Sequence, residues 1–176
     1  MTGKSFDILE TTIAQIHAAY AAGSLRARDL VQAYLDRIEA LDQKGPMLNA
    51  MISFNKNALA EADALDKHYQ ASGPVGSLHG IPLIIKDQAD VAGLPTTLGS
   101  VLFKDHVPDR DCFVVEQLKR AGAIILGKAT LGELGGGDTH GSLFGSTRNP
   151  YDIARTPGGS SGGPAVAAAE IGRAHV

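Results

Sequence analysis

The chain reads Ile81-Pro82-Leu83-Ile84-Ile85-Lys86-Asp87 near its middle, an uninterrupted apolar run closed by two charged residues. A short, continuous apolar run is typical of a strand that is buried on both faces of a sheet. Sheets of that kind have helices packed on them. This segment therefore predicts a strand at the centre of an α/β structure, with Lys86 at the strand's end.

The segments on either side also contain predicted helices and short apolar or β-like runs. A second apolar run, 123–126, follows a helical pattern over 111–121. Upstream, a short β-like stretch at 51–54 precedes a predicted helix over 57–69, and residues 25–41 form an amphipathic helix. Helices followed by buried strands favour the α/β class, and without an internal repeat or a clear linker we expect one domain. Ser24 is the candidate N-cap of the amphipathic helix.

Composition narrows the function classes. The 176 residues are 44% hydrophobic and carry a net charge of −3, from 16 Lys and Arg against 19 Asp and Glu. Without a basic run, we expect no direct binding to nucleic acid and none to an anionic membrane surface. Apolar stretches stay well short of the roughly 20 residues that span a bilayer. The single cysteine, Cys112, and an N-terminus without a signal-peptide pattern predict a cytoplasmic protein.

The motif Pro157-Gly158-Gly159-Ser160-Ser161-Gly162-Gly163-Pro164 places two adjacent serines between paired glycines. Glycine adopts backbone conformations that a β-carbon forbids, so such a loop can hold serine hydroxyls in an unusual geometry. A flexible Gly/Ser linker is the alternative. The flanking prolines and the apolar run 165–169 speak against a linker, because Pro164 suits the first turn of a packed helix. The motif therefore indicates an enzyme.

Three other chemical patterns fit the sequence less well. Residues 122–129 mimic a phosphate-binding loop, but Ala129 stands where that loop needs a hydroxyl. A serine triad would use Ser160 or Ser161 with His79 or His140, and the letters fit a Gly-x-Ser-x-Gly elbow. The polar segment before it is unlike the buried strand that an elbow requires. The histidines show no metal-ligand spacing, so we expect no metal and regard them as structural or surface residues.

Lys86 is the better partner for the serines. A lysine that closes a buried strand can lose its hydration, which disfavours the ammonium and makes a neutral general base accessible. The alternative is a strand-end lysine that reaches solvent or pairs with Asp87 or Asp90, and position alone favours that alternative.

Five short motifs taken together resemble the amidase signature family in their order and spacing: 78–82, 85–87, 127–130, Asn149-Pro150 and 158–163. The resemblance runs from about Leu25 to Ala169. It implies a central mixed β-sheet flanked by helices. It also implies hydrolysis of, or transfer from, a small-molecule carboxamide by a Ser/cis-Ser/Lys triad without cofactors.

Carried onto this chain, the resemblance makes Lys86 the general base and Ser160 the serine whose peptide bond is cis and whose hydroxyl relays the proton. Ser161 would help to hold the Lys86 ammonium or the loop, and the run Gly135-Gly136-Gly137 would belong to a loop near the substrate. A mobile surface loop is the alternative for this run. The acylated serine of the family lies further along than this sequence extends, so the nucleophile is absent from this chain. We therefore expect the 176 residues alone to be inactive.

The end of the sequence departs from the family's pattern. We expect residues 1–169 to be the N-terminal part of a single, truncated amidase domain. Residues 170–176, Glu-Ile-Gly-Arg-Ala-His-Val, match one translation of a sequencing-library adapter, so we expect a non-native tail. Two functional alternatives stay open: the glutaminase subunit of a tRNA-dependent amidotransferase, and a non-catalytic amidase-like binding or scaffold protein.

Overall fold

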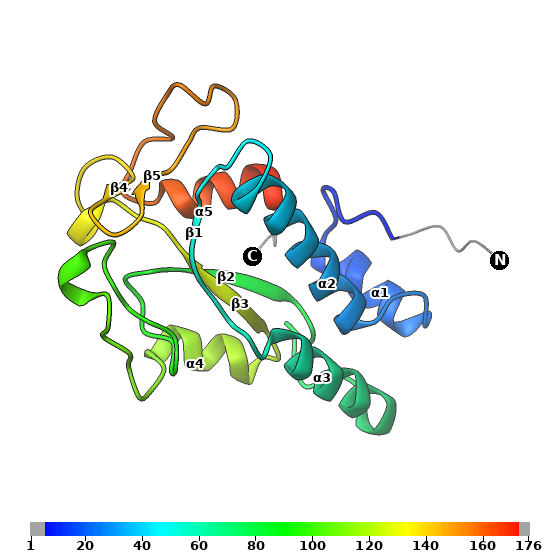
Figure 1. Ribbon diagram of the computed structural model, residues 1–176. Coiled ribbons are helices and arrows are strands. Elements are labelled where there is room, and N and C mark those ends of the chain that lie inside the picture. The colour runs from blue at the N-terminus through cyan, green and yellow to red at the C-terminus, as the bar shows by residue number, and fades with distance from the viewer. Residues whose placement is uncertain (1–5, 173–176) are drawn as a thin grey trace.

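The structure, a computed structural model, describes residues 6–172. Its centre is a three-stranded sheet of β1 (Met51–Phe54), β2 (Pro82–Lys86) and β3 (Ile124–Ala129), in the order β1-β3-β2 (Figure 1). β2 runs parallel to β3, whereas β1 is antiparallel to it. The sheet is therefore mixed, and the α/β class that the sequence predicted is confirmed.

The two apolar runs have different places in this sheet. All six residues of β3 are buried, as expected of a central strand. In β2 only Pro82 and Leu83 are buried, and the next three residues are half-buried. The prediction that this run is buried on both faces was therefore wrong for its second half, because β2 lies at the edge of the described sheet.

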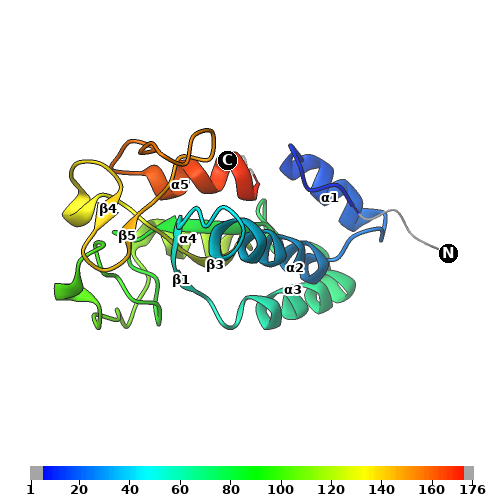
Figure 2. The same cartoon turned by 45° about the horizontal axis from the view of Figure 1, so that its top comes forward.

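Helices of the first half of the chain pack beside the sheet and share its core. α1 spans Ile13–Ala21, α2 spans Ala27–Arg37 and continues into the π-helical turn η1 (Ile38–Gln43), and α3 spans Ala58–Ser72. α2 and α3 lie side by side, and α1 lies at the end of the molecule away from β4 and β5 (Figure 2). Buried side chains from these helices and from β2 and β3 share one hydrophobic core. None of the described helices is long and apolar enough to cross a membrane.

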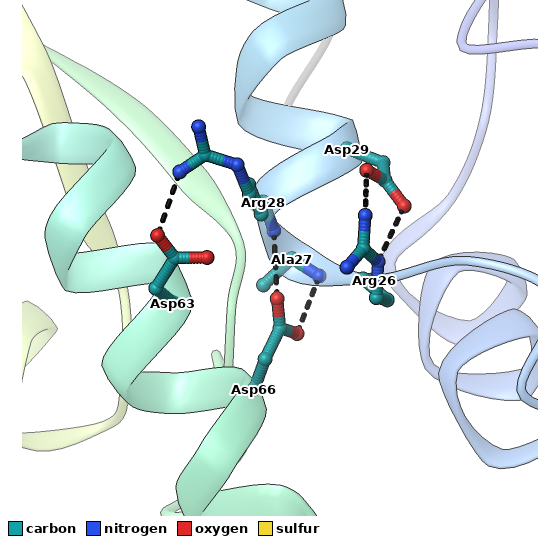
Figure 3. Close-up of polar contacts among 6 residues, drawn as sticks. All are labelled: Arg26, Ala27, Arg28, Asp29, Asp63 and Asp66. Carbon is teal, nitrogen blue, oxygen red and sulfur yellow. Dashed lines mark hydrogen bonds and ion pairs between the residues drawn. The ribbon is translucent and has the colours of Figure 1, made fainter.

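The N-terminus of α2 is capped by a distant residue (Figure 3). The Asp66 carboxylate, on α3, accepts hydrogen bonds from the backbone N–H groups of Ala27 and Arg28, at 2.7 and 3.1 Å. Arg28 also pairs with Asp63 at 2.6 Å. The predicted cap, Ser24, instead donates its hydroxyl proton to the carbonyl of Ala19. The Ser24 prediction was wrong because the cap comes from the neighbouring helix.

Shorter elements follow the first half of the sheet. The 3₁₀ turn η2 (Val101–Phe103) and α4 (Phe113–Arg120) lie between β2 and β3 in the sequence. After β3 come the 3₁₀ turn η3 (Glu133–Gly135) and the small hairpin of β4 (His140–Gly141) and β5 (Gly145–Ser146). α5 (Gly162–Val166) then begins directly after the two serines and continues as the π-helical turn η4 (Ala167–Ile171).

The predicted tail lies partly within these elements. Glu170 and Ile171 end η4, and their carbonyl oxygens accept hydrogen bonds from the guanidinium of Arg37. The Ile171 side chain is buried. Residues 173–176 lie outside the described residues, and the non-native origin of 170–176 stays a prediction.

Candidate active site

Two segments that are far apart in the sequence meet at the end of β2. The side-chain nitrogen of Lys86, Nζ, lies 2.8 Å from Ser160 Oγ and 2.8 Å from Ser161 Oγ. Lys86 and Ser160 are half-buried, and Ser161 is exposed. The peptide bond between Gly159 and Ser160 is cis, as the resemblance implied. The structure thus brings together the lysine and both serines that the sequence singled out.

The backbone around the serines is tightly packed. A Cβ placed on Gly159 would lie 1.9 Å from the carbonyl oxygen of Gly137, and one on Gly162 would lie 2.2 Å from Thr139 Oγ1. Both distances are far shorter than van der Waals contact, so these positions require glycine. The Ser160 carbonyl also accepts a hydrogen bond from Gly132 N–H at 2.9 Å. The flexible-linker interpretation is therefore wrong, and residues 158–162, the serine loop, are held by their neighbours.

Asp87 does not pair with Lys86. Its side chain is fully buried, and its Oδ1 lies 3.2 Å from the Nζ of Lys128. The other oxygen, Oδ2, accepts hydrogen bonds from the backbone N–H and the hydroxyl of Thr97, at 3.0 and 2.6 Å. Successive side chains of a strand point to opposite faces, which leaves Lys86 to the serines while Asp87 faces the interior. The alternative in which Lys86 pairs with Asp87 is therefore wrong.

Lys128 is a structural residue that the sequence reasoning missed. It lies in β3, is fully buried, and donates hydrogen bonds to the Pro95 carbonyl at 2.9 Å and to Thr96 Oγ1 at 2.6 Å. Burial lowers the pKa of Lys128, and the neighbouring Asp87 carboxylate acts in the opposite direction. Its position shortly after a buried apolar run was the sequence signal that could have identified it as a buried lysine. Three of the four apolar positions at 123–126, in the segment that mimics a phosphate-binding loop, lie in β3, so they form a strand there.

The glycine run Gly135-Gly136-Gly137 touches the serine loop at one end. The Gly137 carbonyl packs against Gly159. Gly135 and Gly136 are exposed, and no atom lies within 4 Å of the place where their side chains would be. The run therefore borders the serines, and a substrate-contacting role for it stays a prediction.

The two histidines considered for a triad lie elsewhere. His79 precedes β2, at the opposite end of that strand from Lys86, and its Nδ1 accepts the Val75 N–H at 3.2 Å. Burial lowers the pKa of His79. The exposed His140 pairs with Ser146 Oγ at 2.8 Å. Neither ring is bonded to Ser160 or Ser161 in the described structure. This agrees with the expectation that these histidines are structural or surface residues.

Known proteins are similar to this chain in sequence. The family model described as Amidase matches residues 29–173. A glutamyl-tRNA(Gln) amidotransferase subunit of Acidothermus cellulolyticus is 40% identical over 93% of this chain and 32% of its own length. The corresponding subunit of Nitratidesulfovibrio vulgaris is 44% identical over 90% of this chain and 32% of its own length.

Solved structures give a similar result. The native peptide amidase of Stenotrophomonas maltophilia is 42% identical, with a TM-score of 0.88 over 93% of this chain and 35% of that protein. An amidase family protein of Bacillus anthracis is 33% identical, with a TM-score of 0.87 over 94% of this chain and 34% of its own. The chain spans about a third of the length of the curated relatives it matches.

Proposed function

This chain belongs to the amidase family, and from that membership we propose that it is part of a longer enzyme that hydrolyses the C–N bond of a small-molecule carboxamide. The observation that carries the proposal is the placement of Lys86 Nζ at 2.8 Å from both Ser160 Oγ and Ser161 Oγ. A lysine amine within hydrogen-bond reach of a serine hydroxyl can act as its general base. The product would be ammonia or an amine.

The two serines suit different roles around one amine. A neutral lysine amine has two N–H donors and one lone pair, so it can donate a hydrogen bond to one hydroxyl while its lone pair accepts from the other. We assign Ser160, which is half-buried and follows the cis bond, as the hydroxyl that gives its proton to Lys86. Lys86 would donate a hydrogen bond to the hydroxyl of Ser161. Ser160 would replace its lost proton by taking one from the serine that attacks the amide carbon. Lys86 would later give the proton that it took from Ser160 to the departing amine.

The attacking serine would come from a part of the protein beyond this chain. We therefore define the extended protein as residues 1–169 followed by the natural continuation of the reading frame, and activity is to be measured on this extended protein. The 176-residue chain by itself is expected to release no ammonia from any amide, because a base and a relay without a nucleophile cannot form an acyl-enzyme.

A second candidate function is favoured by the names of the relatives. Two relatives that are 40 and 44% identical are glutamyl-tRNA(Gln) amidotransferase subunits. In that case the extended protein would release ammonia from glutamine and would work with partner subunits. The similarly close peptide amidase, at 42% identity, favours a free-standing hydrolase instead. We further propose a cytoplasmic location, supported by a single cysteine in the chain.

The test measures ammonia released by the extended protein from peptide amides, from simple carboxamides and from glutamine. Lys86→Ala and Ser160→Ala are compared with Lys67→Ala, which removes an exposed lysine on α3. Loss of the general base is expected to lower kcat by about 10²- to 10⁴-fold, and Lys67→Ala to leave it unchanged. Glutamine turnover that requires partner subunits would favour the second candidate.

Two results would contradict the proposal. An active extended protein that keeps its rate after Lys86→Ala would remove Lys86 from the mechanism. A folded extended protein that binds amides without releasing ammonia from any of them would support the binding or scaffold alternative.

A further inference from the structure

Thr139 lies directly behind the serine loop and has no part in the triad. Its side chain is buried, with 2% of its surface exposed. The hydroxyl donates a hydrogen bond to the Gly158 carbonyl at 2.7 Å and accepts one from the Gly162 N–H at 2.9 Å. The backbone N–H of Thr139 also donates to the Gly158 carbonyl, at 3.1 Å. One residue is thus bonded to both ends of the loop that carries Ser160 and Ser161.

The chemistry of a hydroxyl suits this position. A threonine hydroxyl supplies one donor and can accept as well, whereas a carboxylate only accepts and an ammonium only donates. Here the donor goes to the carbonyl of Gly158 and a lone pair receives the N–H of Gly162. If the hydroxyl were removed, the buried N–H of Gly162 would lose its partner, which is costly in the interior of a protein.

Other residues of segment 132–139 also contact the serine loop. The Gly137 carbonyl packs against Gly159, where no side chain would fit. Gly132, at the start of the segment, donates its N–H to the Ser160 carbonyl at 2.9 Å. Residues 132–139 therefore pack against the serine loop. Within this segment, Thr139 is the residue whose side chain forms hydrogen bonds to the loop.

We propose that Thr139 is a positioning residue that fixes the serine loop so that Ser160 stays within hydrogen-bond reach of Lys86. Its catalytic consequence rests on the proposed function, whereas its effect on the loop does not. Displacing a catalytic group by about 1 Å can cost about 10²-fold in rate. A residue acting on geometry in this way should change kcat more than KM.

The experiment compares Thr139→Val, Thr139→Ala and Thr139→Ser in the extended protein with the control Thr147→Val. Thr147 is equally buried, at 2% exposure, but its hydroxyl donates to the Asn49 carbonyl and pairs with the Thr130 hydroxyl at 2.6 Å, rather than with residues 158–162. Its backbone N–H donates to the Thr139 carbonyl, a bond that a valine at position 147 keeps. The measurements are kcat, KM, the thermal midpoint, and the hydrogen exchange of the peptide that covers 158–163. If the valine variant fails to fold, the alanine variant, which has no branched carbon beside Gly162, replaces it.

We expect Thr139→Val or Thr139→Ala to lower kcat by about 10- to 100-fold with little change in KM, and Thr139→Ser to restore most of the rate. The amide of Gly162 should exchange about three- to tenfold faster in the variants without the hydroxyl, the change expected from losing one net hydrogen bond. Thr147→Val should lower the thermal midpoint and leave both kcat and this exchange rate unchanged.

The outcomes separate the two proposals. An inactive wild-type protein, or one that is indifferent to Lys86→Ala, defeats the proposed function, and the exchange measurement still decides the role of Thr139. An enzyme that depends on Lys86 but keeps its full kcat in a folded Thr139→Ala variant overturns the inference. Unchanged exchange over 158–163 in that variant overturns it as well.

Discussion

Replacing Lys128 by methionine tests how strongly the interior beside the site depends on one charge. The Lys128 ammonium is fully buried, donates hydrogen bonds to the Pro95 carbonyl and the Thr96 hydroxyl, and forms an ion pair with the Asp87 carboxylate at 3.2 Å. Oδ1 of Asp87 makes no hydrogen bond to any described residue, so its compensation is the charge of Lys128. Methionine is unbranched like lysine, is one heavy atom shorter, and carries no charge.

The expected loss of stability follows from the lack of any other charged partner for Asp87 Oδ1 among the described residues. Removing one partner of a buried ion pair leaves an uncompensated charge, and typical losses are about 3–5 kcal/mol. We expect a loss of this size for Lys128→Met, a large fraction of the stability of an ordinary domain. The double variant Lys128→Met/Asp87→Asn should recover much of it. An amide at position 87 carries no charge, and its oxygen can still accept the hydrogen bonds from Thr97.

The assay is urea unfolding of the extended protein, followed by its fluorescence and its circular dichroism. Stability differences are read from shifts of the midpoint at constant slope. The matched control is Arg26→Ala, which removes an exposed ion pair with Asp29 and should cost less than about 1 kcal/mol. The reasoning would be refuted by a Lys128→Met cost as small as that of the control, or by a double variant less stable than Lys128→Met alone.

Three further predictions concern the cap, the serine loop and a buried histidine. Asp66→Ala should destabilise the extended protein by about 1–2 kcal/mol in urea unfolding, because two N–H groups at the start of α2 lose their acceptor, whereas Asp63→Ala should cost less than about 1 kcal/mol. Gly159→Ala should abolish amide hydrolysis, because the added Cβ would lie 1.9 Å from the Gly137 carbonyl; a variant with normal kcat would contradict the described loop. Burial lowers the pKa of His79, so the folded state binds its proton less readily than the unfolded chain, and stability is lost as the pH falls below the ordinary histidine pKa of about 6.5. The thermal midpoint should therefore fall more between about pH 7.5 and 5.5 in the wild type than in His79→Gln, and equal falls would sink this explanation.

Elements with a strong local signal were predictable from the sequence. The strand at 51–54 agrees with β1, and the predicted helices over 57–69 and 111–121 correspond to α3 and α4. The apolar periodicity lies within each element and the turn residues lie at its ends, so the local sequence is sufficient to locate these elements. The amphipathic helix over 25–41 was found as well, but its last turns, Ile38–Gln43, are π-helical, a distinction that periodicity does not make.

Features set by contacts between distant segments were not predictable in this way. Asp66 caps a helix that begins 39 residues earlier in the sequence, and no local pattern marks it as a cap. The half-exposed second half of β2 follows from its place at the sheet's edge, which depends on strand order. Thr139 lies in a glycine-rich segment without periodicity, so its bonds to the serine loop emerge only in three dimensions.

The candidate site itself divides in the same manner. The serine motif was visible from its glycines, and Lys86 from its place after an apolar run. Their meeting could be inferred only through resemblance, because position alone favoured a Lys86 that reaches solvent or pairs with Asp87 or Asp90. The sheet resolves this by turning Asp87 inward to Lys128, so that the neighbouring lysine faces the serine loop.

The pairing of β2 with β3 bears on the order in which the molecule assembles. Lys86 belongs to a β-α-β segment whose parts are close together along the chain, whereas the serine loop reaches it across 74 positions. Closing the larger separation has the greater entropic cost, so we expect β2 and β3 to pair first and the serines to dock late. During synthesis the lysine would emerge well before its hydroxyl partners. The contact between Lys86 and the serine loop would thus form only after β2 and β3 have paired.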